Sequence, residues 1–174
     1  MTQYRIRRAG YRDIQTLVKQ RHAMFAEMHS QSKRDLDVHD RAFPGWARRE
    51  MLAGRFACFL VESASVEVVG GGSVWLREVQ PHAGFKGGKE PYLMSMYTDP
   101  EHRGNGVATM VVNRAITWAK ERGYGAMSLH ASKMGRPLYK KLGWKATSEM
   151  ELNLEKFRKK SPRTARQPSR RSGR

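Results

Sequence analysis

The chain has few of the features that mark secreted or membrane proteins. It contains one cysteine, Cys58, so no internal disulfide can form. Its apolar runs are short, and a stretch such as residues 56–61 falls far below the roughly 18 residues that a membrane span needs. The first residues also lack the apolar stretch of a secretory signal. We therefore expect a soluble protein of the reducing cytoplasm, without membrane contact.

Acidic residues are missing from the C-terminal end. Residues 156–174 contain nine Lys or Arg and no Asp or Glu, which leaves +8 of the total net charge of +17 on residues 1–155. A segment of Lys, Arg, Ser and Pro cannot bury enough apolar area to offset the entropy cost of ordering it. We predict one folded domain over residues 1–155 and a basic, disordered tail over residues 156–174. The positive charge of the domain suits an anionic ligand such as a nucleotide or coenzyme, and equally a weak contact with nucleic acid.

Hydrophobic periodicity predicts alternating strands and helices. Strands are predicted over residues 4–8, 56–62, 66–76, 92–98, 126–131 and 145–154. Helices are predicted from residue 14 to 28, over 47–53, from 108 up to the glycine at 123, and over 136–142. Residues 31–46 contain Pro44 and Gly45 and are predicted to form a loop or a broken helix. Residues 81–90 are predicted to form a glycine-rich loop.

A second glycine loop stands between the strand at 92–98 and the helix that follows it. Gly104 and Gly106 let a phosphate approach the backbone, and the free amides and dipole of a helix N-terminus favour negative charge. Two other phosphate motifs fit less well. The dinucleotide pattern needs Gly or Ala where Thr109 stands, and the P-loop needs a Gly-Lys-Ser/Thr sequence that is absent. Taken alone, the loop is also compatible with an ordinary strand-to-helix turn.

Two blocks of sequence resemble the GNAT family of N-acetyltransferases. The first matches the family signature Gln/Arg-x-x-Gly-x-Gly/Ala and reads Arg103-Gly104-Asn105-Gly106-Val107-Ala108. The second, about thirty residues later, is similar to the family's Leu-Tyr-x-x-x-Gly-Phe helix and reads Leu138-Tyr139-Lys140-Lys141-Leu142-Gly143-Trp144. The resemblance implies an α/β GNAT fold, with a mixed, strongly twisted sheet of six or seven strands flanked by about four helices.

The same resemblance implies that acetyl-CoA is the cosubstrate and lies in the splay between the strands at 92–98 and 126–131. The backbone on either side of Tyr97, at Met96 and Thr98, pairs with the pantetheine arm like an added strand, while the side chains pack in the core. The pyrophosphate is bound by the loop, where Arg103 adds charge and the backbone contribution comes from Gly104, Asn105, Gly106, Val107 and Ala108.

Tyr139 stands at the position of the family's general acid, beside the leaving thiolate. Ser132, seven positions earlier, stands where the family often has Asn and is a candidate polar contact to the cofactor arm. An attacking amine with a pKa of about 10.4 is charged at neutral pH, so a base or a water chain must accept its proton. The candidate bases are His130, Glu27 and Glu149, and the sequence does not choose among them.

The predicted activity is transfer of an acetyl group from acetyl-CoA to an amine of a small molecule or peptide. Six His and one Cys give no metal-ligand spacing, and no Ser-His-Asp signature indicates an acyl-enzyme, so we expect direct transfer in a ternary complex without a metal. A competing class is a basic nucleic-acid-associated protein that uses a GNAT body as an acyl-CoA-binding module. The tail favours that class, but the domain has no recognisable nucleic-acid-binding motif. The acceptor, the acyl chain and the oligomeric state stay open, with a homodimer as one option.

Overall fold

The computed structural model describes residues 4–28, 32–81 and 86–152. The strands and α-helices in these ranges are β1 (Arg5–Arg8), α1 (Ile14–Glu27), α2 (Lys33–Leu52), β2 (Phe56–Glu62), β3 (Val68–Glu78), β4 (Lys89–Thr98), α3 (Val107–Glu121), β5 (Ser128–Leu129) and α4 (Arg136–Lys141). The predicted tail, 156–174, lies outside the described residues. None of the described helices is both long and apolar enough to cross a membrane.

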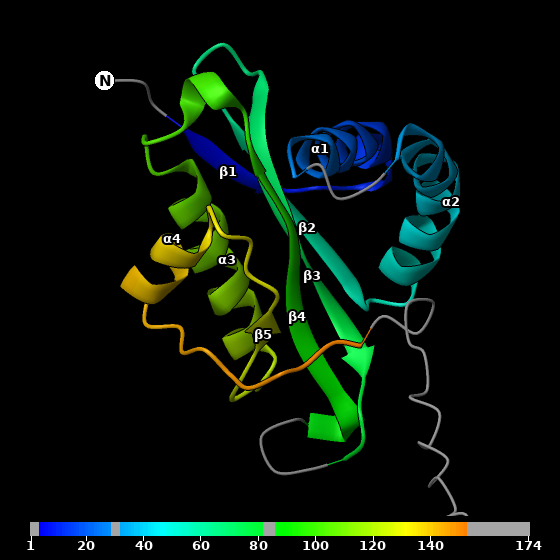
Figure 1. Cartoon of the computed structure of the whole chain (residues 1–174), viewed down its shortest axis with the longest axis vertical. Helices are drawn as coiled ribbons and strands as arrows, with labels where there is room; N and C mark the ends of the chain where they lie inside the picture. The colour runs from blue at the N-terminus through cyan, green and yellow to red at the C-terminus, as the bar shows by residue number, and fades with distance from the viewer. Residues whose placement is uncertain (1–3, 29–31, 82–85, 153–174) are drawn as a thin grey trace, which may run out of the picture.

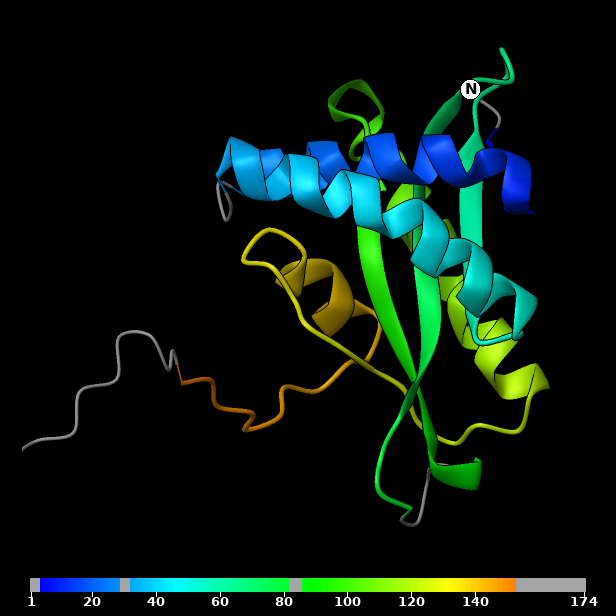
Figure 2. The ribbon, with the colours of Figure 1, turned by 90° about the vertical axis from the view of Figure 1, so that its right-hand side faces the viewer.

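The strands form one mixed sheet in chain order, β1-β2-β3-β4-β5. The neighbours are antiparallel apart from the parallel pair β4 and β5. The helices α1 and α2 cover one face of the sheet, and α3 and α4 cover the other (Figure 1). Seen from the side, α1 and α2 run across the strands in front of the sheet (Figure 2). The predicted α/β fold with helices on both faces is confirmed.

The face under α3 is packed mostly with aliphatic side chains, together with Phe59 and Trp118. Positions three or four apart on α3 point toward the sheet, as expected for an amphipathic helix. The fully buried residues of this side include Val107, Val111, Val112 and Ala115 of α3, with Phe59, Val61, Val74 and Leu93 of the strands. Because burying one such side chain contributes about 1.5–3 kcal/mol, this core fixes α3 firmly against the sheet.

The opposite face, under α1 and α2, is packed largely with aromatic rings. Phe43 and Trp46 of α2 meet Phe56 of β2 and Trp75 of β3. Neighbouring ring centroids in this group lie 4.9–6.2 Å apart, mostly in edge-to-face geometry. Such contacts add to the area term and orient the rings. The second core is therefore smaller in aliphatic content and depends on ring geometry.

The helix α2 is continuous, whereas the sequence predicted a loop or broken helix over residues 31–46. Pro44 lies inside it, which removes one backbone donor and crowds the preceding turn at a cost of about 3 kcal/mol. The buried face of α2 includes Leu36, Phe43 and Ala47. The packing of these side chains outweighs the cost of the proline, so the prediction gave the Pro-Gly pair too much weight.

The sheet has five strands in the described part of the chain, where six or seven were predicted. Residues 145–152 form no strand, and Met150 and Leu152 are 95% and 61% exposed. With these apolar side chains in solvent, the segment has no face to bury against a neighbour. The predicted strand at 126–131 shortens to β5, and residues 153–154 of the predicted last strand lie outside the described residues. Conversely, β4 begins at Lys89, inside the predicted glycine-rich loop.

Candidate active site

A β-bulge interrupts β4 near its middle. The pairing with β3 shifts register between Gly71 and Ser73, so that Ser95 and Met96 together oppose Gly72. Ser95 has a φ of 55°, in the left-handed region that residues other than glycine seldom adopt. A bulge bends its strand and redirects the side chains beside it, and such features are common next to active sites. The strand therefore changes direction at Ser95.

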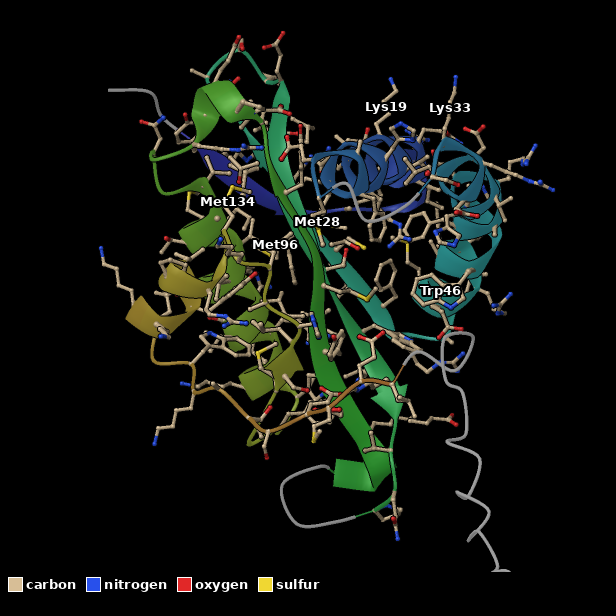
Figure 3. The ribbon with its side chains drawn as sticks, in the orientation of Figure 1. Lys19, Met28, Lys33, Trp46, Met96 and Met134 are labelled. Carbon is tan, nitrogen blue, oxygen red and sulfur yellow. The ribbon has the colours of Figure 1, made fainter. Side chains whose placement is uncertain are left out.

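The glycine opposite the bulge is required by close packing. A Cβ at Gly72 would overlap the Sδ atom of Met96 and lie 2.8 Å from Cγ1 of Val111. Met96 packs against the core between the sheet and α3, as expected from the sequence for its side chain. Figure 3 shows Met96 at the centre of the molecule, between the two pairs of helices.

β4 and β5 separate just before the bulge. β5 pairs only with Tyr92 and Leu93, whereas β4 continues to Thr98. At the joined end, the buried carboxylate of Glu90 accepts a hydrogen bond from the hydroxyl of Ser128, which ties the two strands together. Among the described residues no strand pairs with this edge of β4 from Met94 onward. Its backbone groups can therefore pair with an extended ligand.

The separated end of β4 leads directly into the glycine loop. Gly104 and Gly106 have φ values of 78° and 81°, and a Cβ on either would meet no atom within 4 Å. Gly106 is the N-cap of α3, and Val107 buries its side chain in the core while its amide stays at the helix start. Asn105 donates from Nδ2 to the carbonyl oxygen of Arg103 at 3.2 Å, and Ala108 lies in the first helical turn. An open loop at a positive helix end fits a pyrophosphate.

Arg103 lies between the end of β4 and the end of α1. Its Nε donates to the carbonyl oxygen of Thr98 at 3.0 Å, and its Nη2 donates to both carboxylate oxygens of Glu27 at 2.7 Å. The positive charge expected for the pyrophosphate is therefore shared with an acid in this structure. The same pair places Glu27, a candidate base, at the loop and not at the bulge.

Tyr139 and Ser132 are brought together at the start of α4. The hydroxyl oxygen of Ser132 accepts a hydrogen bond from the amide of Gly135 at 3.1 Å, which fixes the turn into the helix. A Cβ at Gly135 would lie 3.0 Å from the ring of Tyr139, so the glycine permits this close approach. Tyr139 is 8% exposed and lies edge-on to Trp144, with ring centroids 5.9 Å apart. Burial raises the pKa of Tyr139 to about 12, so the phenol keeps its proton at neutral pH.

The two other candidate bases are exposed. His130 follows β5, and Glu149 lies in the irregular segment after α4. Both interact with Tyr92. Burial is the main cause that raises the pKa of this phenol, Arg77 lowers it, the charge of Glu149 raises it further, and a hydrogen bond with the backbone of His130 lowers it. Within the ranges that the structure describes, no three His, Cys, Asp or Glu side chains gather as metal ligands.

Three features of this region were not predicted from the sequence. The bulge at Ser95 was missed because a strand pattern does not reveal an extra residue in one partner. The sequence assigned no role to the buried carboxylate of Glu90 or to the half-buried guanidinium of Arg21. The run of three glycines in β3, which includes Gly72, was the one signal in the sequence that could have indicated a close approach of backbones.

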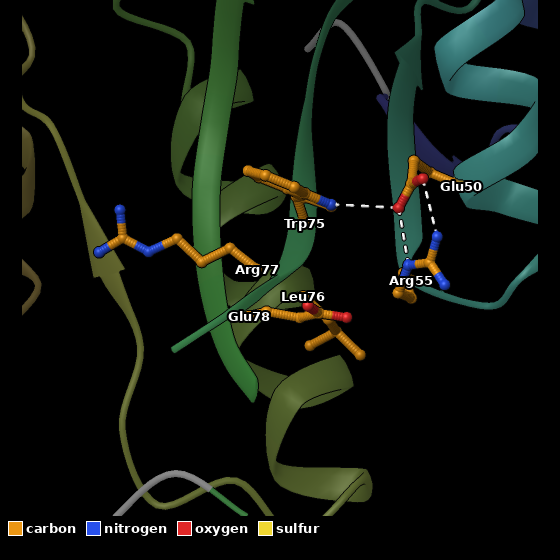
Figure 4. Close-up of a pocket in the computed structure, with 6 residues that line it drawn as sticks. All are labelled: Glu50, Arg55, Trp75, Leu76, Arg77 and Glu78. Carbon is orange, nitrogen blue, oxygen red and sulfur yellow. Dashed lines mark hydrogen bonds and ion pairs between the residues drawn. The ribbon is translucent and has the colours of Figure 1, made fainter. Parts of the chain in front are cut away.

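A hollow of about 430 Å³ lies at the other end of the sheet, beside the end of α2 (Figure 4). Its most buried acid, Glu50, accepts two hydrogen bonds of 2.8 Å from Arg55 and a third of 3.4 Å from the indole of Trp75. Arg55 holds the pKa of Glu50 below its usual range. A carboxylate saturated in this way anchors α2 to the sheet, and the hollow lies far from the glycine loop (Figures 1 and 4).

Several solved structures share the fold of this chain. A GCN5-related N-acetyltransferase from Ralstonia eutropha JMP134 is 28% identical, with a TM-score of 0.79 over 88% of this chain and 99% of that chain. A predicted acetyltransferase from Clostridium acetobutylicum, solved with acetyl-CoA, is 29% identical, with a TM-score of 0.80 over 89% and 99%. An aminoglycoside antibiotic 6′-N-acetyltransferase from Acinetobacter haemolyticus, 17% identical with a TM-score of 0.65 over 88% and 99%, shares the fold alone. No curated protein matches the chain.

The family model agrees with the geometry. It is the model of the acetyltransferase (GNAT) family, and it matches residues 19–144. This range begins within α1 and ends after α4, so it includes the bulge, the splayed strands, the glycine loop and Tyr139. The match takes in well over half of the chain, and the chain therefore belongs to the GNAT acetyltransferase family.

Proposed function

We propose that this protein transfers the acetyl group of acetyl-CoA directly to an amine of a small molecule or peptide, in a ternary complex. The observation that carries the proposal is the continuous path from the open glycine loop, along the unpaired edge of β4, to the bulge at Ser95. The Clostridium relative was solved with acetyl-CoA, which fits such a path.

The pyrophosphate end of the coenzyme would be held by backbone amides. The amides from Asn105 to Ala108 surround the start of α3, where the helix dipole favours negative charge. Arg103 lies beside them and exchanges part of its contact with Glu27 for the phosphates. Because these donors belong to the main chain, the site depends on the loop conformation more than on side chains.

The pantetheine arm would continue along β4. The stretch from Thr98 back to Ser95 spans about 10 Å, since a strand rises roughly 3.3 Å per residue. Pairing with the backbone at Thr98 and Met96 brings the end of the arm to the bulge, where the strand bends away. The reacting carbonyl would then lie between the α3/α4 side, which holds Tyr139, and the α1/α2 side, from which the acceptor would approach.

Tyr139 would donate a proton to the departing thiolate. Its phenol is protonated at neutral pH because burial raises its pKa to about 12, and a neutral donor is what leaving-group expulsion needs. Ser132 lies against the same turn, where its hydroxyl already accepts from Gly135 and can donate its own proton. Glu27 is engaged by Arg103, so proton removal from the amine falls to solvent, His130 or Glu149.

The proposal is tested by two measurements on the full chain. Calorimetry should detect acetyl-CoA binding, and the ligand should raise the melting temperature because it binds the native state selectively. A panel of amines, polyamines, aminoglycosides, amino acids and peptides should then include acceptors that release thiol from acetyl-CoA above the rate of hydrolysis. Failure to bind acetyl-CoA at millimolar concentration would overturn the proposal.

A further inference from the structure

The guanidinium of Arg21 lies between α1, α2 and the bulge of β4. Its Cζ atom is 4.4 Å from the ring centroid of Phe43 and 5.2 Å from that of Phe25. Its Nη1 donates to the hydroxyl of Ser95 at 3.2 Å. Arg21 therefore joins an aromatic cluster to the residue at which β4 changes direction.

Arg21 is half-buried and retains unused donors. A guanidinium has five N–H donors, and the structure gives one of them a side-chain acceptor, on Ser95. Over the described ranges, no carboxylate lies within 4.0 Å of its nitrogens. Asp40 acts on it from farther away but is bound to Nδ1 of His22 at 2.6 Å. Burial lowers the pKa of Arg21, and the negative charge of Asp40 partly offsets this effect.

Three other partly buried arginines have close carboxylate partners. Arg7 pairs with Asp13, Arg55 with Glu50, and Arg77 with Glu90, each at 2.5–2.8 Å. Arg114, which is also partly buried, has Glu121 at 3.6 Å, whereas the structure gives Arg21 no carboxylate within 4.0 Å among the described residues. A buried charge without such a partner is costly, and sites of this kind commonly recognise an anion.

We propose that the acceptor is a small amino acid whose carboxylate binds Arg21 while its amine faces the bulge. The inference rests on the proposed function, which brings the acetyl group to the bulge. Because Arg21 contacts the bulge residue itself, amine and carboxylate must be separated by only a few bonds. This favours a free amino acid over the N-terminus of a peptide.

A monoanion fits this site better than a phosphate group. A planar guanidinium forks two parallel hydrogen bonds to a carboxylate, and two aromatic rings already restrict its plane. Arg21 supplies one positive charge at this site, and the nearby negative charge of Asp40 opposes a second negative charge on the ligand. We therefore assign the unused donors to one carboxylate.

Matched acceptors separate this inference from the proposed function. Each common α- and β-amino acid is assayed beside its carboxamide, which keeps the amine and side chain and removes the charge. The wild type should acetylate at least one amino acid with a kcat/KM ten-fold or more above that of its carboxamide. If acetyl-CoA binds and amines are acetylated, but no amino acid is preferred over its carboxamide, the proposed function stands and the inference about Arg21 is overturned.

Variants then assign the preference to Arg21. Arg21→Gln should lower kcat/KM for the preferred amino acid by about 10- to 100-fold, the range for losing a charged hydrogen-bonded pair, and change that of the carboxamide less than three-fold. Lys19→Gln is the control and should leave kcat/KM for both acceptors unchanged. Lys19 is exposed on the same helix and points away from the sheet (Figure 3). Arg21→Lys keeps the positive charge but loses the two parallel donors of the guanidinium. Its kcat/KM for the preferred amino acid should lie between that of the wild type and that of Arg21→Gln. An equal loss for acid and amide would make Arg21 a packing residue and overturn the inference. Unchanged acetyl-CoA affinity verifies that each variant is folded.

Discussion

The two faces of the sheet are built by different means. On the α3/α4 face, mostly aliphatic side chains fix α3 against the sheet, and the proposed ligand groups are main-chain amides at Gly106 and the following residues. On the α1/α2 face, aromatic rings and charges from distant segments meet, as at Arg21 and Ser95. Main-chain recognition tolerates changes of side chain and suits a ligand common to a family. Side-chain recognition suits a ligand that is specific to one member.

The largest effect on acetyl-CoA binding is expected from disrupting the loop amides on the α3/α4 face. Gly106→Glu places a side chain and a negative charge where the pyrophosphate would lie, so acetyl-CoA binding should fall at least 100-fold. Gly54→Glu is the matched control, because Gly54 also has a positive φ of 67° with open space around it, but it lies after α2. Both variants should pay a similar strain of about 1 kcal/mol. Calorimetry compares the acetyl-CoA affinity of the two variants. If Gly106→Glu still binds acetyl-CoA, the loop is only a turn.

The next effect concerns chemistry on the same face. Tyr139→Phe keeps the ring and its packing, so acetyl-CoA affinity should stay within a few-fold while kcat falls by roughly 10²-fold, as for loss of a general acid. Tyr124→Phe is the control, since Tyr124 packs on the same core. Steady-state kinetics and calorimetry on both variants provide the comparison. Equal turnover of the two variants would leave Tyr139 as a packing residue.

The same phenol predicts a change of stability at high pH. Burial raises the pKa of Tyr139 from its ordinary 10 to about 12, so the native state holds the proton more tightly than the unfolded chain. Stability is therefore unaffected below pH 10 and is lost as the pH rises from 10 to 12. Urea midpoints measured across this window should fall less steeply for Tyr139→Phe than for the wild type. Parallel curves would show that the tyrosine ionises freely in the folded state.

A smaller effect on acetyl-CoA affinity is expected from the ion pair of Arg103 and Glu27, which joins the glycine loop to α1. Glu27→Gln releases Arg103 to the phosphates, so acetyl-CoA affinity should rise about two- to five-fold at low salt, since a half-exposed ion pair contributes little. Glu101→Gln removes the same charge from an exposed position beside the loop and should have less effect. Calorimetry at two salt concentrations measures the difference. A hundred-fold loss of kcat in Glu27→Gln would instead identify Glu27 as the base.

The smallest effect should come from the tail. Truncation before Lys156 removes nine positive charges and almost no apolar area, so acetyl-CoA affinity and turnover should stay within two-fold. Nonspecific binding to DNA, if the full chain shows it, should fall and depend less on salt. A melting temperature lower by several degrees would show that the tail packs on the domain.

Local patterns predicted the α3/α4 face well. The helix from Val107 follows from apolar residues at spacings of three and four, and the loop follows from two glycines at the helix start. Local patterns failed to predict the structure of segments whose conformation depends on packing against residues far away in the sequence. Pro44 was given more weight than the buried face of α2, and residues 145–152 were predicted as a strand although the fold offers them no partner.

The sequence by itself therefore determined the family, most of the strands and helices up to α4, and the glycine loop at a helix start, because each depends on residues close together in the chain. Only the tertiary structure decided what Arg21, Glu27 and Ser95 contact. Arg21 reaches a hydroxyl 74 positions away, and Glu27 pairs with an arginine 76 positions away. Ionic contacts and hydrogen bonds act over a few ångströms in space, so a charge shows its role only after folding has placed its neighbours.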